Sequence, residues 1–169
     1  MKKSIKTVIL TALIAAVYAA VTLAVSPISY GPLQFRISEA LIMLAAFTPL
    51  SVPGLTLGCV LANLMSPYGI IDIVLGSLAT FLSLAAARLL FKKIGQKSIY
   101  LMPILQAVFN GLIVGAELSY LTAPSGAFAA TFLTSALYVA LGEIVVGYVI
   151  GLPLYFLLKK VNFEKLIRK

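Results

Sequence analysis

The chain has 169 residues, of which 62% are hydrophobic, and a formal net charge of +8. Soluble domains are about half apolar, so this composition excludes an ordinary soluble protein and indicates a chain that is dissolved in lipid. The basic residues lie at the ends of apolar runs rather than along one face, which argues against binding to nucleic acid. We therefore expect residues 1–169 to form a single integral domain in the cell membrane.

Side chains that commonly carry catalysis or bind metals are scarce. The sequence has one cysteine, Cys59, and no histidine, so a disulfide within the chain is impossible and the usual zinc and haem ligand sets are missing. It also lacks a phosphate-binding glycine loop with lysine and a Gly-x-Ser-x-Gly motif. We expect no enzyme activity, metal or cofactor, and we interpret Cys59 as a small packing residue.

Long apolar runs predict membrane-spanning helices at residues 4–25, 70–91, 98–116 and 127–158. The first run is longer than the apolar region of a signal peptide and further spans follow it, so we interpret it as a retained helix. Between residues 40 and 65, Pro49, Pro53, Gly54 and Gly58 leave two interpretations open, one broken span or a hairpin of two short helices.

The distribution of lysine and arginine decides between these two. Basic residues in short loops mark the cytoplasmic side, and here they form three groups. These are Lys2, Lys3 and Lys6; Lys92, Lys93 and Lys97; and Lys159, Lys160, Lys165, Arg168 and Lys169. If all three groups are cytoplasmic, the chain crosses the membrane an even number of times between the first and the second. The sequence therefore predicts the hairpin, and an all-α polytopic protein with six transmembrane helices and both termini in the cytoplasm.

This topology gathers polar residues in the outer half of the membrane. Intramembrane ionisable groups are costly and usually face a cavity or a partner, so such a gathering predicts a binding pocket that is open to the outside. Its candidate residues are the carboxylates Glu39, Asp72, Glu117 and Glu143, the loop residue Arg36, and Asn63 and Asn110 near outer helix ends.

Structural roles are open for the same charged residues. Glu39 and Asp72 fall in the first turn of a predicted helix, where a carboxylate favours the positive end of the helix dipole. Glu117 is predicted to end a helix, where a negative charge is unfavourable and requires a cation or a donor nearby. Glu143 lies in an apolar run, and its structural alternative is an ion pair with Arg36.

The uncharged candidates also have structural alternatives. Asn63 and Asn110 could form hydrogen bonds between helices rather than to a ligand. Tyr30, Tyr68 and Tyr120 are placed in outer loops, where an interfacial aromatic belt explains them as well as stacking on a ligand does.

Small residues form stripes on the first predicted helix. Ala12, Ala16 and Ala20 recur every four residues, and Ala15 and Ala19 do the same. In lipid such stripes allow another helix to approach closely. The partner could be a helix of this chain or a separate membrane subunit, and the pattern alone does not distinguish the two.

Three ordered blocks of sequence resemble a known family. Residues 30–40 (YGPLQFRISEA), 58–63 (GCVLAN) and 72–80 (DIVLGSLAT) are similar to successive blocks of the queuosine-precursor transporter family, QueT. That family belongs to the substrate-binding S-components of energy-coupling factor (ECF) transporters. The resemblance implies a six-helix fold with both termini inside, and partners that comprise a transmembrane coupling subunit and two cytosolic ATPases. It also implies that Ala12, Ala16 and Ala20 contact the coupling subunit.

The resemblance further implies a substrate, a queuosine precursor such as aminomethyl-deazaguanine or queuine. One carboxylate can accept the two adjacent N–H donors of a guanine-like edge, and the ammonium favours a second carboxylate. We expect Glu39, Glu117 and Glu143 to act here before Asp72. Further candidates are Asn63, Asn110 and Gln34 for reading the base, and Phe35, Tyr68 and Tyr120 for stacking on it.

Three other functions remain open at this stage. The chain could be an S-component for another vitamin, with thiamine and biotin as the obvious candidates. It could be a small oligomeric channel or a structural membrane protein whose outer carboxylates form ion-attracting rings. It could also be an autonomous transporter that is driven by an ion gradient.

Overall fold

The computed structural model describes residues 3–31 and 34–168, with side chains for residues 5–31 and 34–167, and all of the regular structure in these ranges is helical. Lys2 and Lys169 of the basic groups, and Pro32 and Leu33 of the first sequence block, lie outside the described residues. The elements are α1 (Lys3–Ala24), α2 (Ser26–Ser29), η1 (Ile37–Ala46), α3 (Ser51–Asn63), α4 (Ile70–Ile94), η2 (Gly95–Tyr100), α5 (Met102–Thr122), α6 (Phe128–Val146), η3 (Gly147–Gly151), α7 (Leu152–Lys160) and α8 (Phe163–Arg168).

Among the described residues, four helical segments are long and apolar enough to cross a membrane, namely Ile5–Ala24, Ile70–Tyr100, Met102–Thr122 and Phe128–Lys160. They correspond to the four long runs that the sequence predicted. The boundary of α5 was wrong, because the helix continues to Thr122, close to the helix-stopping Pro124. Glu117 therefore lies inside α5 rather than at its end, and Tyr120 lies in the helix rather than in a loop.

Two short apolar helices, η1 and α3, fill the segment for which a hairpin was predicted. The turn between them contains Pro49. The sequence did not predict that η1 is a 3₁₀ helix. A 3₁₀ helix rises about 2.0 Å per residue, so the ten residues of η1 extend over about 20 Å, further than an α-helix of equal length. The count of six crossings itself stays a prediction.

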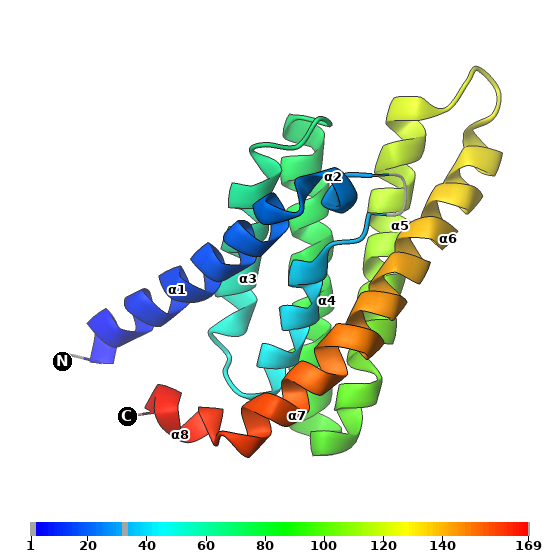
Figure 1. The fold of residues 1–169 in the computed structure, drawn as a ribbon. Helices are drawn as coiled ribbons and strands as arrows, with labels where there is room; N and C mark the ends of the chain where they lie inside the picture. The colour runs from blue at the N-terminus through cyan, green and yellow to red at the C-terminus, as the bar shows by residue number, and fades with distance from the viewer. Residues whose placement is uncertain (1–2, 32–33, 169) are drawn as a thin grey trace.

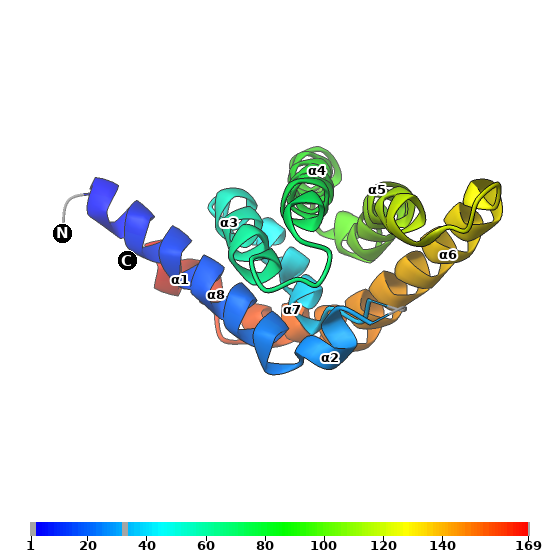
Figure 2. The same ribbon diagram turned by 90° about the horizontal axis from the view of Figure 1, so that it is seen from above.

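The helices α3, α4 and α5 stand side by side in a row, and α1 and α6 slant across its two ends (Figures 1 and 2). Along the chain, α1 packs on α3, α3 on α4, α4 on α5, and α5 on α6. The short η1 contacts α1, α3, α4, α5, α6 and α7, which places it at the centre of the bundle. Both ends of the chain lie at the same end of the bundle (Figure 1).

The contact between α1 and α3 depends on small residues. A Cβ atom at Gly58 would lie 2.7 Å from the Cβ of Tyr18 and 2.8 Å from the carbonyl oxygen of Ala15, so only glycine permits this approach. The two alanine stripes of α1 separate here. Ala15 and Ala19 are buried within the chain, whereas the other stripe is exposed on the surface of the bundle: Ala12, Ala16 and Ala20.

Candidate functional site

A cluster of buried polar side chains lies among the apolar helices around η1, and we call it the polar cluster. Its members come from six helices and from the segment before η1, and all of them are at most 4% exposed. Burial of polar and charged groups away from water costs free energy unless they find partners, so their partners indicate what the cluster does. The members are Tyr18, Arg36, Glu39, Cys59, Asn63, Asp72, Thr80, Gln106, Asn110, Glu117 and Glu143.

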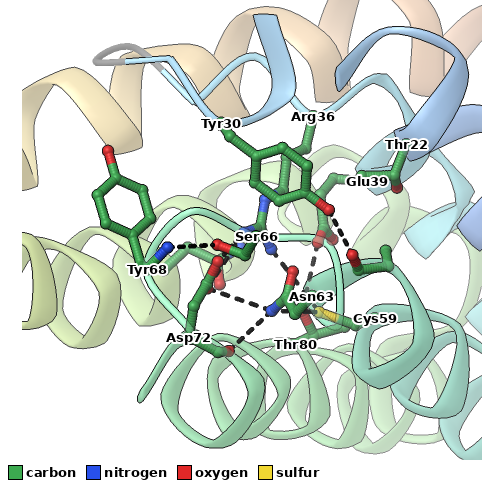
Figure 3. A network of polar contacts seen from close by, with 12 residues as sticks. Thr22, Tyr30, Arg36, Glu39, Cys59, Asn63, Ser66, Tyr68, Asp72 and Thr80 are labelled. Atoms are coloured by element: carbon green, nitrogen blue, oxygen red, sulfur yellow. Dashed lines mark hydrogen bonds and ion pairs between the residues drawn. The ribbon is translucent and has the colours of Figure 1, made fainter. Parts of the chain in front are cut away.

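Arg36 and Asp72 form a buried ion pair at the start of α4. The Nη2 atom of Arg36 lies 3.2 Å from Oδ1 and 3.3 Å from Oδ2 of Asp72, and Asn63 Nδ2 donates to the same carboxylate at 3.2 Å (Figure 3). A Cβ at Gly76 would lie 2.5 Å from Asp72 Oδ1, so glycine makes room for this group. The alternative in which Arg36 pairs with Glu143 was wrong, because the ion pair of Arg36 in the described chain is with Asp72.

Glu39 of η1 forms hydrogen bonds to side chains of three other helices. Its Oε1 atom accepts hydrogen bonds from the Tyr18 hydroxyl of α1 and from Thr80 Oγ1 of α4, the latter at 3.3 Å. Its Oε2 atom accepts from Gln106 Nε2 of α5. Both carboxylate oxygens of Glu39 are thus engaged within the protein.

Glu117 and Glu143 differ from Glu39 in having free oxygens. Asn110 Nδ2 donates to Glu143 Oε1 at 2.7 Å, but Glu143 Oε2 has no hydrogen-bond partner in the described part of the chain. Neither oxygen of Glu117 has one, although this side chain is only 1% exposed. Gln106, Asn110 and Glu117 lie four and seven residues apart, so they share one face of α5.

Acidic side chains outnumber basic ones in the polar cluster. It holds the four carboxyl groups of Glu39, Asp72, Glu117 and Glu143 and a single guanidinium, that of Arg36. Only Asp72 is close enough to Arg36 to form an ion pair among the described residues. The cluster therefore has several acidic groups without a basic partner, and a ligand that brings N–H donors or a positive charge would complement them.

Cys59 is fully buried, as expected of a packing residue, but its sulfur also serves the polar cluster. It accepts weak hydrogen bonds from Thr80 Oγ1 at 3.4 Å, from Asn63 Nδ2 at 3.6 Å and from Arg36 Nη1 at 3.7 Å (Figure 3). These contacts help to orient the guanidinium and amide groups.

The segment before η1 positions Arg36. Gln34 is 3% exposed and has a φ of 44°, in the left-handed region that few residues other than glycine adopt. Strain of this kind is often found at functional sites. The Tyr30 ring centroid lies 5.5 Å from the Arg36 guanidinium, and its hydroxyl donates to the carbonyl oxygen of Ala62 at 2.6 Å. The loop residues thus hold one face of the guanidinium.

The other aromatic candidates have different surroundings. Tyr68 is half-buried, and burial together with the nearby carboxylates of Asp72 and Glu117 raises its pKa, so the phenol stays neutral. Phe35 is also half-buried. Tyr120 is 75% exposed, so the structure does not bring it into the polar cluster.

Sequence reasoning missed three residues of the polar cluster, Tyr18, Thr80 and Gln106. A spacing signal was present for two of them, since Thr80 follows Asp72 and Gly76 at intervals of four and Gln106 precedes Asn110 by four. No comparable signal marks Tyr18. Its role depends on the crossing of α1 over η1, which only the tertiary structure supplies.

A charged cluster that is buried inside an apolar helical bundle is typical of membrane proteins that bind or move a polar solute. The fold and the polar cluster thus define a multi-pass membrane protein with a polar interior. The sequence profile described as QueT transporter matches residues 8–160, and the chain belongs to the QueT transporter family. This confirms the resemblance seen in the three sequence blocks.

A curated relative agrees with this membership. The chain is 39% identical over 97 residues to the "Queuosine precursor transporter QueT" of Lactococcus lactis subsp. cremoris (strain MG1363). The match covers 55% of this chain and 56% of the relative, so it spans about half of the relative's length. No solved structure matches the chain.

Proposed function

We propose that the chain is the substrate-binding S-component of an ECF importer, and that it takes up a queuosine precursor across the cell membrane. The observation that carries this proposal is the buried polar cluster, in which carboxylate oxygens of Glu117 and Glu143 have no partner in the described chain. Membership of the QueT transporter family and the name of the Lactococcus relative support the same substrate class.

The chemistry of the substrate suits the polar cluster. Aminomethyl-deazaguanine carries adjacent N–H donors on its guanine-like edge and a positive charge on its side chain. Carboxylates accept such donors through short, charge-assisted hydrogen bonds. The surplus of carboxylates around Arg36 therefore favours a ligand that is rich in donors and positively charged.

We also propose that the chain crosses the membrane six times, with η1 and α3 as short crossings and both termini in the cytoplasm. Lys92 and Lys93 at the end of α4 and Lys97 in η2 lie at the end of the bundle that also holds both chain ends (Figure 1). Lys159 and Lys160 end α7 near the same place. Basic residues favour the cytoplasmic side, which supports this orientation.

Partner subunits would supply the energy for transport. Ala12, Ala16 and Ala20 form a stripe that is exposed on α1, where another transmembrane helix could approach closely. We propose that the coupling subunit docks on this stripe and that two cytosolic ATPases drive release of the substrate inwards. Ligand binding by itself shifts the balance between two conformations only as far as the ligand's affinities for them differ. Transport therefore needs an external source of free energy.

Calorimetric titration of the purified protein with aminomethyl-deazaguanine, guanine, thiamine and biotin tests the substrate. Selective binding of the deazaguanine is expected. Binding of thiamine or biotin instead would support an S-component for another vitamin. If nothing binds and ionic currents arise in a bilayer without partners, the channel function is correct.

Uptake by cells tests the mechanism separately. We expect accumulation of the labelled precursor to require the ATPase and coupling subunits. Uptake that persists after the ATPase genes are deleted would contradict the ECF mechanism and support a transporter driven by an ion gradient.

A further inference from the structure

We infer that the four carboxylates of the polar cluster divide into two pairs with different tasks: Glu39 and Asp72 position the site, whereas Glu117 holds a paired N–H edge of the ligand and Glu143 holds its cationic group. This inference rests on the proposed function. It goes further by assigning individual ligand groups to individual residues, from the hydrogen bonds that each carboxylate has already made.

Glu39 and Asp72 are already engaged. The two oxygens of Glu39 accept from Tyr18, Thr80 and Gln106. Asp72 accepts from both Arg36 and Asn63, and a side chain at Gly76 would collide with it. A ligand that bound either carboxylate directly would compete with these partners, whereas the oxygens of Glu117 and Oε2 of Glu143 have no partner in the described chain. Their geometry suits residues that hold Arg36, Gln106 and Asn63 in place.

Glu117 offers two free oxygens. Both are shielded from solvent, and neither has a partner in the described chain. Such a carboxylate can accept two parallel N–H bonds at once. A ring edge with two adjacent N–H donors, such as the N1–H and 2-amino groups of a guanine-like base, matches this geometry. A single ammonium group is a compact charge without a fixed parallel pair of donors, so it matches the two oxygens less closely.

Glu143 offers one free oxygen. Its Oε1 atom already accepts from Asn110 at 2.7 Å, so only Oε2 remains for a ligand. One oxygen cannot accept a paired edge in the bidentate manner, but it can pair with a compact cation. Glu143 is 3% exposed, and a buried carboxylate is best stabilised by a ligand group that brings both a donor and a positive charge.

Other free atoms of the polar cluster also suit a ligand rich in donors. Gln106 Oε1 and Asn63 Oδ1 are buried acceptors without a partner in the described chain. The corresponding donors are Arg36 Nε and, in the segment before η1 and outside the polar cluster, Gln34 Nε2. Together with the two oxygens of Glu117 and Oε2 of Glu143, these acceptors without a partner outnumber the donors without one. A ligand with several N–H groups and few acceptors would satisfy more of these atoms than one with the opposite pattern.

Two ligands that differ in one group separate the tasks of Glu117 and Glu143. Aminomethyl-deazaguanine and cyano-deazaguanine share the paired N–H edge, but only the first carries a cation. We would measure the dissociation constants of both for the unaltered protein, for Glu117→Gln and for Glu143→Gln. Glu164→Gln, which alters an exposed carboxylate outside the polar cluster, is the matched control.

The expected pattern is a crossed one. Glu117→Gln should weaken the binding of both ligands by a similar factor, about 10- to 100-fold, because a charge-assisted hydrogen bond is lost in each case. Glu143→Gln should weaken only the aminomethyl ligand by such a factor and leave the cyano ligand within about twofold. Glu164→Gln should change the dissociation constant of neither ligand. The unaltered protein should bind the aminomethyl ligand more tightly than the cyano ligand.

Other patterns would overturn the assignment in distinguishable ways. Suppose that the unaltered protein binds the ligands but both variants keep its affinities, or that Glu117→Gln affects only the aminomethyl ligand while Glu143→Gln affects both. Either result refutes the division of tasks and leaves the proposed function standing. Failure of the unaltered protein to bind either deazaguanine refutes both.

A variant that does not fold is recognised by its elution and thermal unfolding in detergent. In that case the unaltered protein itself supplies the test. An aminomethyl ligand without the 2-amino group should bind about 10-fold or more weakly than the complete one, since one of the two bonds to Glu117 is lost. Equal affinity for these two ligands would overturn the paired-edge assignment.

Discussion

The buried ion pair between Arg36 and Asp72 offers the sharpest test of how the polar cluster is held together. Asp72→Asn keeps the shape of the side chain and removes its charge. Arg36 is 4% exposed and Asp72 is 0% exposed, so the guanidinium would lose its partner without gaining water. Breaking one side of a buried pair costs about 3–5 kcal/mol of unfolding free energy.

The structure places the expected cost at the lower end of this range. The two contacts of Arg36 Nη2 to Asp72 are 3.2 and 3.3 Å long, which is longer than the roughly 2.7–2.9 Å of strong charge-assisted hydrogen bonds. A loss of about 3 kcal/mol corresponds to a decrease in the unfolding temperature of about 6–12 °C for a domain of this size.

Thermal unfolding of the purified protein in detergent measures the effect. Glu164→Gln is the control and should shift the unfolding temperature by about 2 °C or less, because exposed carboxylates contribute little. The double variant Arg36→Gln/Asp72→Asn removes both charges and should recover part of the loss. An Asp72→Asn protein as stable as the unaltered one, or a double variant less stable than the single, would refute the reasoning.

Three further predictions concern the contacts around the polar cluster and the surface of α1. Tyr18→Phe removes one donor from Glu39 and should lower the free energy of unfolding by about 1–3 kcal/mol, whereas Tyr120→Phe, at a 75% exposed position, should leave the unfolding temperature unchanged. Gly58→Ala places a methyl group 2.7 Å from the Tyr18 Cβ and should cost about 1–3 kcal/mol by separating α1 from α3; an unfolding temperature equal to that of the unaltered protein would contradict this packing. Ala16→Leu should leave ligand affinity in detergent unchanged but reduce co-purification of the coupling subunit and uptake by cells by about 10-fold or more, while Val17→Leu, at the adjacent exposed position, should reduce neither; equal uptake by the two variants would show that the stripe is not the docking surface.

Several features of the fold followed directly from the sequence. Apolar runs of sufficient length predicted the four long helices, because in lipid the backbone must satisfy its hydrogen bonds within a helix. Charge parity required a hairpin between α1 and α4, and two short helices lie there. The 3₁₀ geometry of η1 was not predictable, because it depends on packing against the surrounding helices and not on the composition of the segment.

The membership of the polar cluster was predicted better than its bonding. The cost of charge in lipid was sufficient to select Arg36, Glu39, Asp72, Glu117 and Glu143 as candidates, and all five are buried together. Their pairing was not predictable, because residues 36 and 72 meet only when η1 and α4 pack. The one ion pair considered from the sequence joined residue 36 to residue 143.

Two ambiguities of the sequence required the tertiary structure for a physical reason. Alanine stripes one residue apart on α1 look alike in sequence, and only the position of α3 leaves Ala12, Ala16 and Ala20 exposed while Ala15 and Ala19 are buried. Likewise, a carboxylate is free or engaged according to which donors reach it from other helices. The sequence alone determined that this is a polytopic membrane protein with a charged interior; the packing of η1 among its neighbours decided which of those charges have partners and which remain free.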